Sequence, residues 1–224
     1  MAHYEVEIKS LLGGKEHADA LLARMYAQDA ATALTSRNKQ LNHYFEGGDV
    51  GVLVASVKDL FDETAQNKLA TMVERGKNFS VRTRERDGEV LLVLKASVDE
   101  GTSSNTVSRL EFEEPVTLAL SDLDQKVLDA GFRYQAKWSR EREEYTYKDI
   151  AVCLDRNAGY GYLAEFEKVA DLEADVLQVR AEIEALMAEL GVAELPQDRL
   201  ERMFAHYNQN WPEYYGTDKI FVIE

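Results

Sequence analysis

The sequence contains one cysteine, three prolines and only 26 lysines and arginines against 41 aspartates and glutamates, so its 224 residues carry a formal net charge of −15. A single cysteine, Cys153, excludes an intrachain disulfide and a zinc site built from several cysteines. The acidic excess disfavours binding to long nucleic acids, which requires a basic face. No apolar run approaches the roughly 20 residues that span a bilayer, and no basic segment followed by an apolar one opens the sequence. We therefore expect a cytoplasmic protein that binds neither long nucleic acids nor membranes.

Apolar residues make up 45% of the chain, and 11 tyrosines, 8 phenylalanines and 2 tryptophans are among them. Side chains of this size bury enough surface to offset the entropy lost on folding, so a disordered acidic protein is excluded. Cys153 lies in an apolar run with no obvious base nearby. This setting favours a small buried side chain over a nucleophile.

Several segments alternate between apolar and polar residues, which is the period of a strand with one buried face. The dipeptide Asp87-Gly88 separates two such runs and predicts a tight β-hairpin. The predicted strands span residues 4–10, 40–46, 79–86, 89–96, 106–115, 134–147, 150–156 and 162–169, and the predicted helices span 15–33, 49–74, 122–130, 171–190 and 196–207. Because the helices join the strands without alternating with them, the pattern predicts an α+β fold, an antiparallel sheet or closed barrel with flanking helices.

Charged residues recur at a spacing of two within these strands, which places each set on one face of its strand. The sets are Glu5, Glu7 and Lys9; Arg82, Arg84 and Arg86; Arg109, Glu111 and Glu113; Arg140 and Arg142; and Glu165 and Glu167, while Lys95 and Asp155 each end an apolar run. The simplest explanation is the solvent face of an antiparallel sheet. A solvent face usually mixes polar residues without sorting them by sign, whereas several of these strands carry only acids or only arginines.

In a closed sheet these charges would line an interior, where each charge needs a partner or a ligand. Arginine binds phosphate oxygens through two parallel hydrogen bonds. Clustered carboxylates hold hard divalent cations such as Mg²⁺ or Mn²⁺. A small triphosphate with a bound metal ion would satisfy both sets at once, so the pattern favours such a molecule as the partner.

In their order along the chain, these motifs resemble those of the CYTH superfamily, the triphosphate tunnel metalloenzymes. The resemblance covers about residues 3–169: Glu5-x-Glu7-x-Lys9 resembles the family's ExExK signature, VRTRERDGEVLLVLKAS its Arg-x-Arg hairpin ending in lysine, and LDRNAGYGYLAEFEKV its closing Glu-x-Glu segment. It implies an eight-stranded antiparallel β-barrel, open as a tunnel, over residues 1–170. Residues 171–224 would form a helical C-terminal extension packed on the same domain.

The resemblance also implies roles for individual residues. The triphosphate would be bound by Lys9, Arg82, Arg84, Lys95, Arg140 and Arg142. The metal ligands would be Glu5, Glu7, Glu165 and Glu167, with Asp155, Glu111 and Glu113 as further candidates. Glu7 and Lys9 are the expected catalytic residues, with Glu7 as a candidate for activating water. The C-terminal segment resembles the family's closing helix only loosely, so a direct substrate role for Tyr207 is not expected.

Three functions fit this pattern. The first is a metal-dependent triphosphatase that uses Mg²⁺ or Mn²⁺ to hydrolyse tripolyphosphate, thiamine triphosphate or a nucleoside triphosphate. The alternative is a class IV adenylyl cyclase, in which the ribose 3′-hydroxyl attacks the α-phosphorus and pyrophosphate leaves. The third is a module that binds polyphosphate without turnover. For the oligomeric state, both a monomer and a homodimer stay open.

Overall fold

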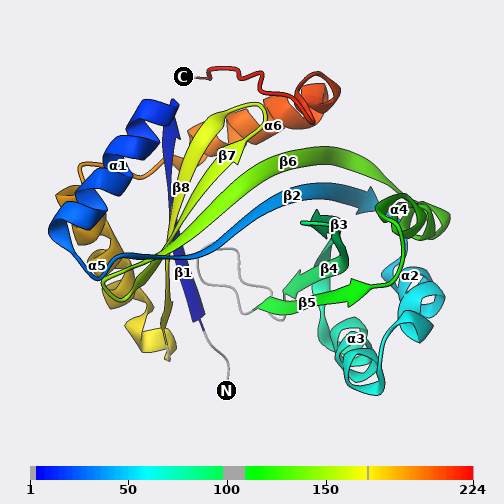
Figure 1. Ribbon diagram of the computed structural model, residues 1–224. Helices are drawn as coiled ribbons and strands as arrows, with labels where there is room; N and C mark the ends of the chain where they lie inside the picture. Colours follow the sequence, from blue (N-terminus) through cyan, green and yellow to red (C-terminus); the bar gives the residue numbers. More distant parts are fainter. Residues whose placement is uncertain (1–3, 98–108, 171, 224) are drawn as a thin grey trace. The chain divides into compact units, whose positions relative to one another are not determined.

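The computed structural model describes residues 4–97, 109–170 and 172–223 (Figure 1). The strands are β1 (Tyr4–Gly13), β2 (Ala33–Gly47), β3 (Lys77–Arg86), β4 (Glu89–Ser97), β5 (Arg109–Val116), β6 (Phe132–Tyr147), β7 (Ile150–Asn157) and β8 (Gly161–Ala170). The helices are α1 (Lys15–Gln28), α2 (Val50–Val57), α3 (Glu63–Arg75), α4 (Leu120–Asp129), α5 (Val176–Glu189) and α6 (Gln197–Tyr214), with 3₁₀ helices at Lys58–Leu60 and Glu173–Asp175. Residues 106–108 of one predicted strand and residue 171 of one predicted helix lie outside the described residues.

The eight strands form one sheet in the order β1-β8-β7-β6-β2-β3-β4-β5. Six pairs of neighbouring strands are antiparallel, which confirms the predicted α+β class and, over the described residues, the number of strands. Across the described residues no pairing joins the edge strands β1 and β5, so the sheet is not closed and the predicted barrel is not confirmed. Alternation within a strand fixes which face a residue occupies. Closure depends instead on pairing between edge strands far apart in the sequence, which no local pattern encodes.

Several predicted elements differ in their bounds: α1 ends at Gln28 and not at residue 33, α5 begins at Val176 and not at residue 171, and α6 extends to Tyr214 and not only to residue 207. The helix predicted over 49–74 is interrupted, because α3 begins anew at Glu63, with Asp62 as its N-cap. The side chain of Asp62 accepts a hydrogen bond from the Ala65 N–H at 2.9 Å, a start signal that the continuous apolar spacing concealed. The strand β2 begins at Ala33 and not at residue 40. The sequence analysis missed its first half because that half carries no apolar alternation.

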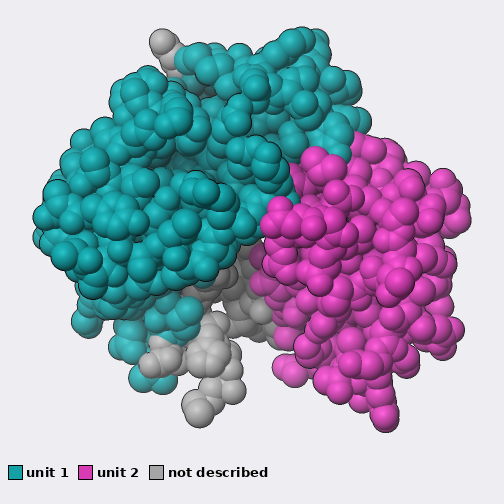
Figure 2. Space-filling view, viewed as in Figure 1, with its two compact units in different colours: residues 1–39, 139–224 teal, residues 40–138 magenta. Residues whose placement is uncertain are grey.

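The chain divides into two compact units: unit 1 comprises residues 1–39 and 139–224, and unit 2 comprises residues 40–138 (Figure 2). The strands β2 and β6 each contribute residues to both units. The boundary predicted after residue 170 falls inside unit 1 and stays a prediction. None of the helices in the described ranges is long and apolar enough to cross a membrane.

In unit 1 the apolar core lies on one face of the sheet, beneath α1 and α5 (Figure 1). The core includes Val6 and Ile8 of β1, Val152 of β7, Phe166 of β8, Leu21 of α1 and Ile183 of α5. Successive side chains of a strand point to opposite faces. The residues that alternate with this core, among them Glu7, Lys9 and Glu165, therefore point away from the two helices.

Within unit 1, the segment from Leu195 to Phe221 packs on β1 and on the turn before β8. The Leu195 N–H donates to the carbonyl oxygen of Lys9 at 2.7 Å, and the Phe221 N–H donates to the carbonyl oxygen of Gly159 at 2.5 Å. Gly159 has a φ of +94°, and a Cβ there would lie 2.5 Å from Cδ2 of Tyr207, so only glycine fits. Tyr207 of α6 is fully buried against this turn.

Unit 2 has its own core, on the face of its strands covered by α2, α3 and α4 (Figure 1). The core includes Leu53 of α2, Leu69 of α3, Leu123 of α4, Val81 of β3, Leu92 of β4 and Phe112 of β5. Arg82, Arg84 and Glu113 alternate with these residues and so lie on the opposite face.

A buried polar cluster joins α4 to the strands of unit 2. Asp124, which is 3% exposed, accepts hydrogen bonds from His43 Nδ1 at 2.7 Å, Thr83 Oγ1 at 2.5 Å and the Tyr134 hydroxyl at 2.7 Å. Lys137 Nζ lies 4.0 Å from the same carboxylate. Burial alone would raise the pKa of Asp124, but the three hydrogen bonds outweigh it and hold this pKa below its ordinary value.

Asp124→Ala should lower the free energy of unfolding by about 3 kcal/mol near neutral pH, because it leaves buried donors without their acceptor. Since the pKa of Asp124 is lowered on folding, its contribution is present above the ordinary carboxyl pKa of about 4 and is lost as the pH falls through the lower folded value. Urea unfolding at neutral pH and at about pH 3 should therefore show a smaller difference between variant and wild type in acid. Asp129→Ala, at an exposed position on α4, is the control. Equal losses in both variants would contradict the role of the cluster.

Candidate functional site

The register of unit 1 assembles predicted charged residues in rows across four strands, on the face away from its core. Lys9 of β1 lies opposite Glu165 of β8, and Glu165 lies opposite Cys153 of β7. Cys153 in turn lies opposite Glu144 of β6. The neighbouring rows pair Glu7 with Glu167 and Asp155 with Arg142. Residues far apart in the sequence therefore share one charged face.

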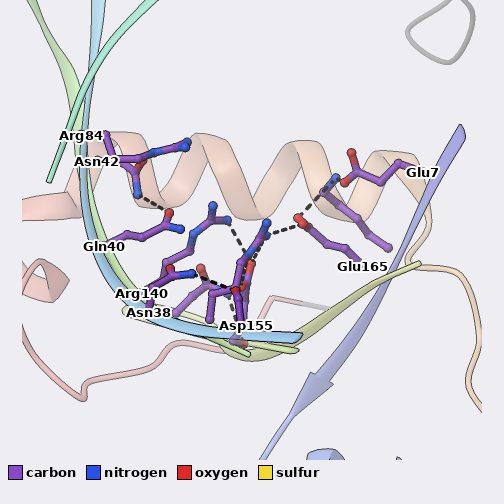
Figure 3. A network of polar contacts seen from close by, with 12 residues as sticks. Glu7, Asn38, Gln40, Asn42, Arg84, Arg140, Asp155 and Glu165 are labelled. Atoms are coloured by element: carbon purple, nitrogen blue, oxygen red, sulfur yellow. Dashed lines mark hydrogen bonds and ion pairs between the residues drawn. The ribbon is translucent and has the colours of Figure 1, made fainter. Parts of the chain in front are cut away.

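Ion pairs connect these rows (Figure 3). Lys9 Nζ contacts the carboxylate of Glu7 and lies 3.6 Å from that of Glu165. Glu165 also accepts a hydrogen bond from Arg142 Nη2. Burial alone would raise the pKa of Glu165, but the charges of Lys9, Arg142 and Arg140 hold it below its ordinary value. Glu165 is therefore ionised at neutral pH.

Asp155 joins the two arginines of β6. Its Oδ1 accepts from Arg142 Nε at 2.7 Å, and its Oδ2 accepts from Arg142 Nη2 at 2.6 Å and from Arg140 Nη1 at 3.0 Å. Burial would lower the pKa of Arg142, but the hydrogen bonds and charge of Asp155 raise it above its ordinary value. Arg142 therefore stays cationic although it is largely buried.

Unit 2 has a second charged face, on the side away from its own core. Arg84 Nε donates to Asn42 Oδ1 at 2.6 Å, and Arg84 Nη1 donates to Glu113 at 2.8 Å. The amide of Asn42 donates to Gln40 Oε1 at 3.3 Å. Arg86 Nη1 lies 3.7 Å from the Glu113 carboxylate. Since an amide oxygen accepts without carrying charge, Asn42 orients Arg84 without neutralising it.

The remaining predicted residues of unit 2 are also held by neighbours. The guanidinium carbon of Arg82 lies 4.4 Å from the centroid of the Tyr44 ring, a cation–π contact that leaves the positive charge in place. Arg82 Nε also donates to Ser80 Oγ at 3.3 Å. Lys95 Nζ lies 2.8 Å from the carboxylate of Glu111.

The structure therefore brings the predicted residues together in two groups. Unit 1 holds Glu7, Lys9, Arg140, Arg142, Asp155, Glu165 and Glu167, and unit 2 holds Arg82, Arg84, Lys95, Glu111 and Glu113. Glu5 and Arg109 lie in β1 and β5, but their side chains are outside the described part of the structure. The roles implied by the family resemblance stay predictions.

Four residues of the charged faces escaped the sequence analysis. Asn42 and Tyr44 lie opposite the arginines of β3, Gln40 bonds Asn42, and Glu144 lies on the charged face of β6. The sequence does contain a pattern that could have identified three of them, because Gln40, Asn42 and Tyr44 recur at the same spacing of two. Glu144 continues the alternation of the Arg-x-Arg pair before it. Gln40, Asn42 and Tyr44 carry no charge, so the pattern of charged residues at a spacing of two did not include them.

The carboxylates of unit 1 fit a divalent cation in their chemistry. Glu7 and Glu167 lie directly opposite each other in β1 and β8, a placement that destabilises strand pairing unless a cation offsets it. Carboxylate oxygens are the donors that Mg²⁺ and Mn²⁺ prefer. Within the described ranges, no three acidic, histidine or cysteine side chains already converge on one point. Glu7 and Glu165 are instead paired with Lys9.

Cys153 is buried, as predicted, but it lies on the charged face of β7 and not in the apolar core. Burial, together with the charges of Glu165, Asp155 and Glu144, raises the pKa of its thiol to about 12, although the charge of Arg142 opposes this rise. The thiol is therefore protonated at neutral pH, which argues against a nucleophilic role.

A family model described as the CYTH domain matches residues 62–199. The fold is similar to that of a candidate adenylate cyclase from Vibrio parahaemolyticus, with a TM-score of 0.59 and 16% identity over 92% of this chain and 99% of that chain. It is also similar to a conserved hypothetical protein from Pyrococcus furiosus, with a TM-score of 0.60 and 18% identity over 88% of this chain and 98% of that chain. A protein from Pyrococcus horikoshii is similar too, with a TM-score of 0.59 and 18% identity over 91% of this chain and 99% of that chain. At these identities the likeness concerns the fold alone. No curated protein matches the sequence.

Cys153 should react slowly with Ellman's reagent in the folded protein at mildly alkaline pH, because its raised pKa leaves very little thiolate. Relative to the chain unfolded in urea, the rate should be lower by about a thousandfold. The chain has no other cysteine, so the absorbance change reports this thiol alone. Equal rates in the folded and unfolded protein would contradict both the burial of Cys153 and the field of the surrounding carboxylates.

Proposed function

The chain belongs to the CYTH domain family, and we propose that it is a divalent-metal-dependent triphosphatase, which hydrolyses tripolyphosphate, thiamine triphosphate or a nucleoside triphosphate. One observation supports this most: in each unit, cations and carboxylates share the sheet face that points away from the core. An ordinary solvent face gives no reason to bury an ion pair as deeply as that of Arg142 and Asp155.

The cations would bind the phosphate chain. Arg140 and Arg142 offer guanidinium groups, whose planar forks match phosphate oxygens. Lys9 offers a compact ammonium group at the edge strand of the same face. In unit 2, Arg82 is held by the neutral ring of Tyr44, whereas Arg84 is bonded to Asn42 and paired with Glu113.

The carboxylates Glu7, Glu165 and Glu167 would hold the divalent cation. When bound, Mg²⁺ or Mn²⁺ would neutralise charge on the phosphate oxygens. In the structure Lys9 pairs with Glu7 and Glu165, so both carboxylates have a cationic partner before any ligand arrives. Lys9 can exchange these partners for phosphate oxygens, and the face stays balanced throughout.

For hydrolysis, Glu7 would act as the base. Its carboxylate takes a proton from water, the water oxygen forms a bond to the terminal phosphorus, and the bridging P–O bond breaks. The electron pair of that bond leaves on the oxygen of the departing diphosphate. Lys9, in contact with Glu7, lies where it can stabilise the charge on the terminal phosphoryl group.

The alternative is an adenylyl cyclase, the activity named for the Vibrio parahaemolyticus protein of similar fold. The charged faces would then bind ATP, the ribose 3′-hydroxyl would attack the α-phosphorus, and pyrophosphate would leave. The pattern of charged residues fits this reaction as well, and one fold commonly serves several chemistries. Hydrolysis requires no pocket for a base, so the simpler site favours it.

Incubation of the purified protein with tripolyphosphate and with ATP, each with Mg²⁺ or Mn²⁺, separates the candidate functions. The proposal predicts release of orthophosphate. Formation of cyclic AMP and pyrophosphate from ATP would contradict it in favour of the cyclase. Tight binding without any product would contradict both and indicate a polyphosphate-binding module. The cytoplasmic location and the choice between monomer and homodimer stay predictions.

Lys9→Ala should reduce turnover by about a hundredfold or more while the protein stays folded, because it removes a cation from the reacting phosphate. Lys39→Ala is the matched control, since Lys39 is exposed and pairs with Glu141, which points to the other side of β6. Phosphate release and circular dichroism are measured for both variants and for Glu7→Gln. Wild-type rates in both Lys9→Ala and Glu7→Gln would rule out this face of unit 1 as the reaction site.

A further inference from the structure

We propose that Asp155 is a positioning residue for Arg140 and Arg142, in place of the metal-ligand role that the family resemblance implies for it. This inference rests on the proposed function, because the molecule that the two arginines would bind is a triphosphate. All three side chains belong to the hairpin of β6 and β7 and lie on the charged face of unit 1. Figure 3 shows Arg140 and Asp155.

Both oxygens of Asp155 are already used by arginine donors. Arg142 donates to Oδ1 and Oδ2, and Arg140 donates to Oδ2, through three hydrogen bonds of 2.7, 2.6 and 3.0 Å. A carboxylate offers about four lone-pair sites, so little capacity remains. A metal ion at Asp155 would have to displace a guanidinium group and leave it without its partner in a buried position, which is unfavourable.

Asp155 is also less accessible than the other carboxylates of this face. Its side chain is 1% exposed, against 14% for Glu165 and 34% for Glu7. Mg²⁺ gives up its bound waters reluctantly and usually keeps several of them. The more open Glu7, opposite Glu167, meets that requirement, whereas Asp155 does not.

The arrangement holds the two arginines in fixed positions. Arg142 bonds both Asp155 and Glu165, and Arg140 bonds Asp155, so two carboxylates balance the two guanidinium groups. The hydrogen bonds of Arg142 to the described residues use Nε and Nη2 and leave Nη1 without an acceptor. Because β6 and β7 pair with Arg142 directly opposite Asp155, the backbone register itself sets this geometry. The guanidinium groups are therefore oriented before a ligand arrives, which lowers the entropy lost on binding.

A proton–nitrogen NMR spectrum of the arginine side chains tests the inference in the wild-type protein. The buried Nε–H of Arg142 should give a slowly exchanging signal, assigned by its loss in Arg142→Lys. Addition of Mg²⁺ alone should leave this signal in place, because Asp155 keeps its arginine. If Mg²⁺ instead abolishes the slow exchange, Asp155 has turned to the metal and the inference is wrong.

Asp155→Asn provides a second test, because it keeps the shape of the side chain but removes its charge. Its Mn²⁺ affinity, measured by electron paramagnetic resonance, should stay within about threefold of wild type, whereas Glu167→Gln should weaken it by about tenfold or more. Its kcat/KM for tripolyphosphate should fall by about a hundredfold. Asp149→Asn is the matched control, since Asp149 is exposed in the turn of the same hairpin and pairs with Lys168. Equal losses of Mn²⁺ affinity in Asp155→Asn and Glu167→Gln would overturn the inference.

Failure of the proposed function gives a different result from failure of this inference. If the wild-type protein neither binds nor hydrolyses tripolyphosphate, the triphosphatase is wrong, while the exchange of the Arg142 Nε–H and its response to Mg²⁺ still report on Asp155. If circular dichroism shows that Asp155→Asn does not fold, the titration of the wild-type protein remains decisive.

Discussion

Strand register is the constraint on which the rest of the structure depends. In unit 1, Ile8 and Phe166 point into the core, and Lys9 and Glu165, their neighbours in sequence, point to the charged face. A slip of one residue would bury Lys9 in the core and expose Ile8. Burial of apolar side chains beneath the helices therefore fixes the register, and the register places each ion pair. The electrostatic arrangement of one face is stabilised by the hydrophobic effect on the other.

The charged faces also limit what the net charge implies about anionic ligands. A chain of net charge −15 disfavours a large polyanion, yet each cation of unit 1 named above is already bonded to a carboxylate. Such pairs satisfy buried charges while no ligand is bound. Under the proposed function, a triphosphate that carries a divalent cation would replace them partner for partner, since its oxygens would take the arginines and its metal the carboxylates. The proposal therefore fits a small chelated anion better than a long bare one.

Most of the fold could be predicted from local patterns. The hairpin at Asp87-Gly88 forms as expected, with positive φ at both residues, and the charges spaced by two do share faces. Features that depend on pairing between strands far apart in the sequence could not be predicted. The main one is that β1 and β5 do not pair with each other across the described residues. Neutral residues such as Asn42 were missed for another reason, because their role appears only when the partner strand places Arg84 beside them. The burial of Asp155 between two arginines likewise follows from register.

Calorimetric titration with tripolyphosphate, without and with Mg²⁺, tests most directly whether the charged faces form an anion site. Oriented guanidinium and ammonium groups bind more strongly as more phosphate oxygens reach them. The affinity should therefore fall from tripolyphosphate to pyrophosphate to orthophosphate, and it should weaken as salt is added. Absence of binding in the presence of Mg²⁺, or equal affinity for all three anions, would contradict the assignment of these faces to a triphosphate.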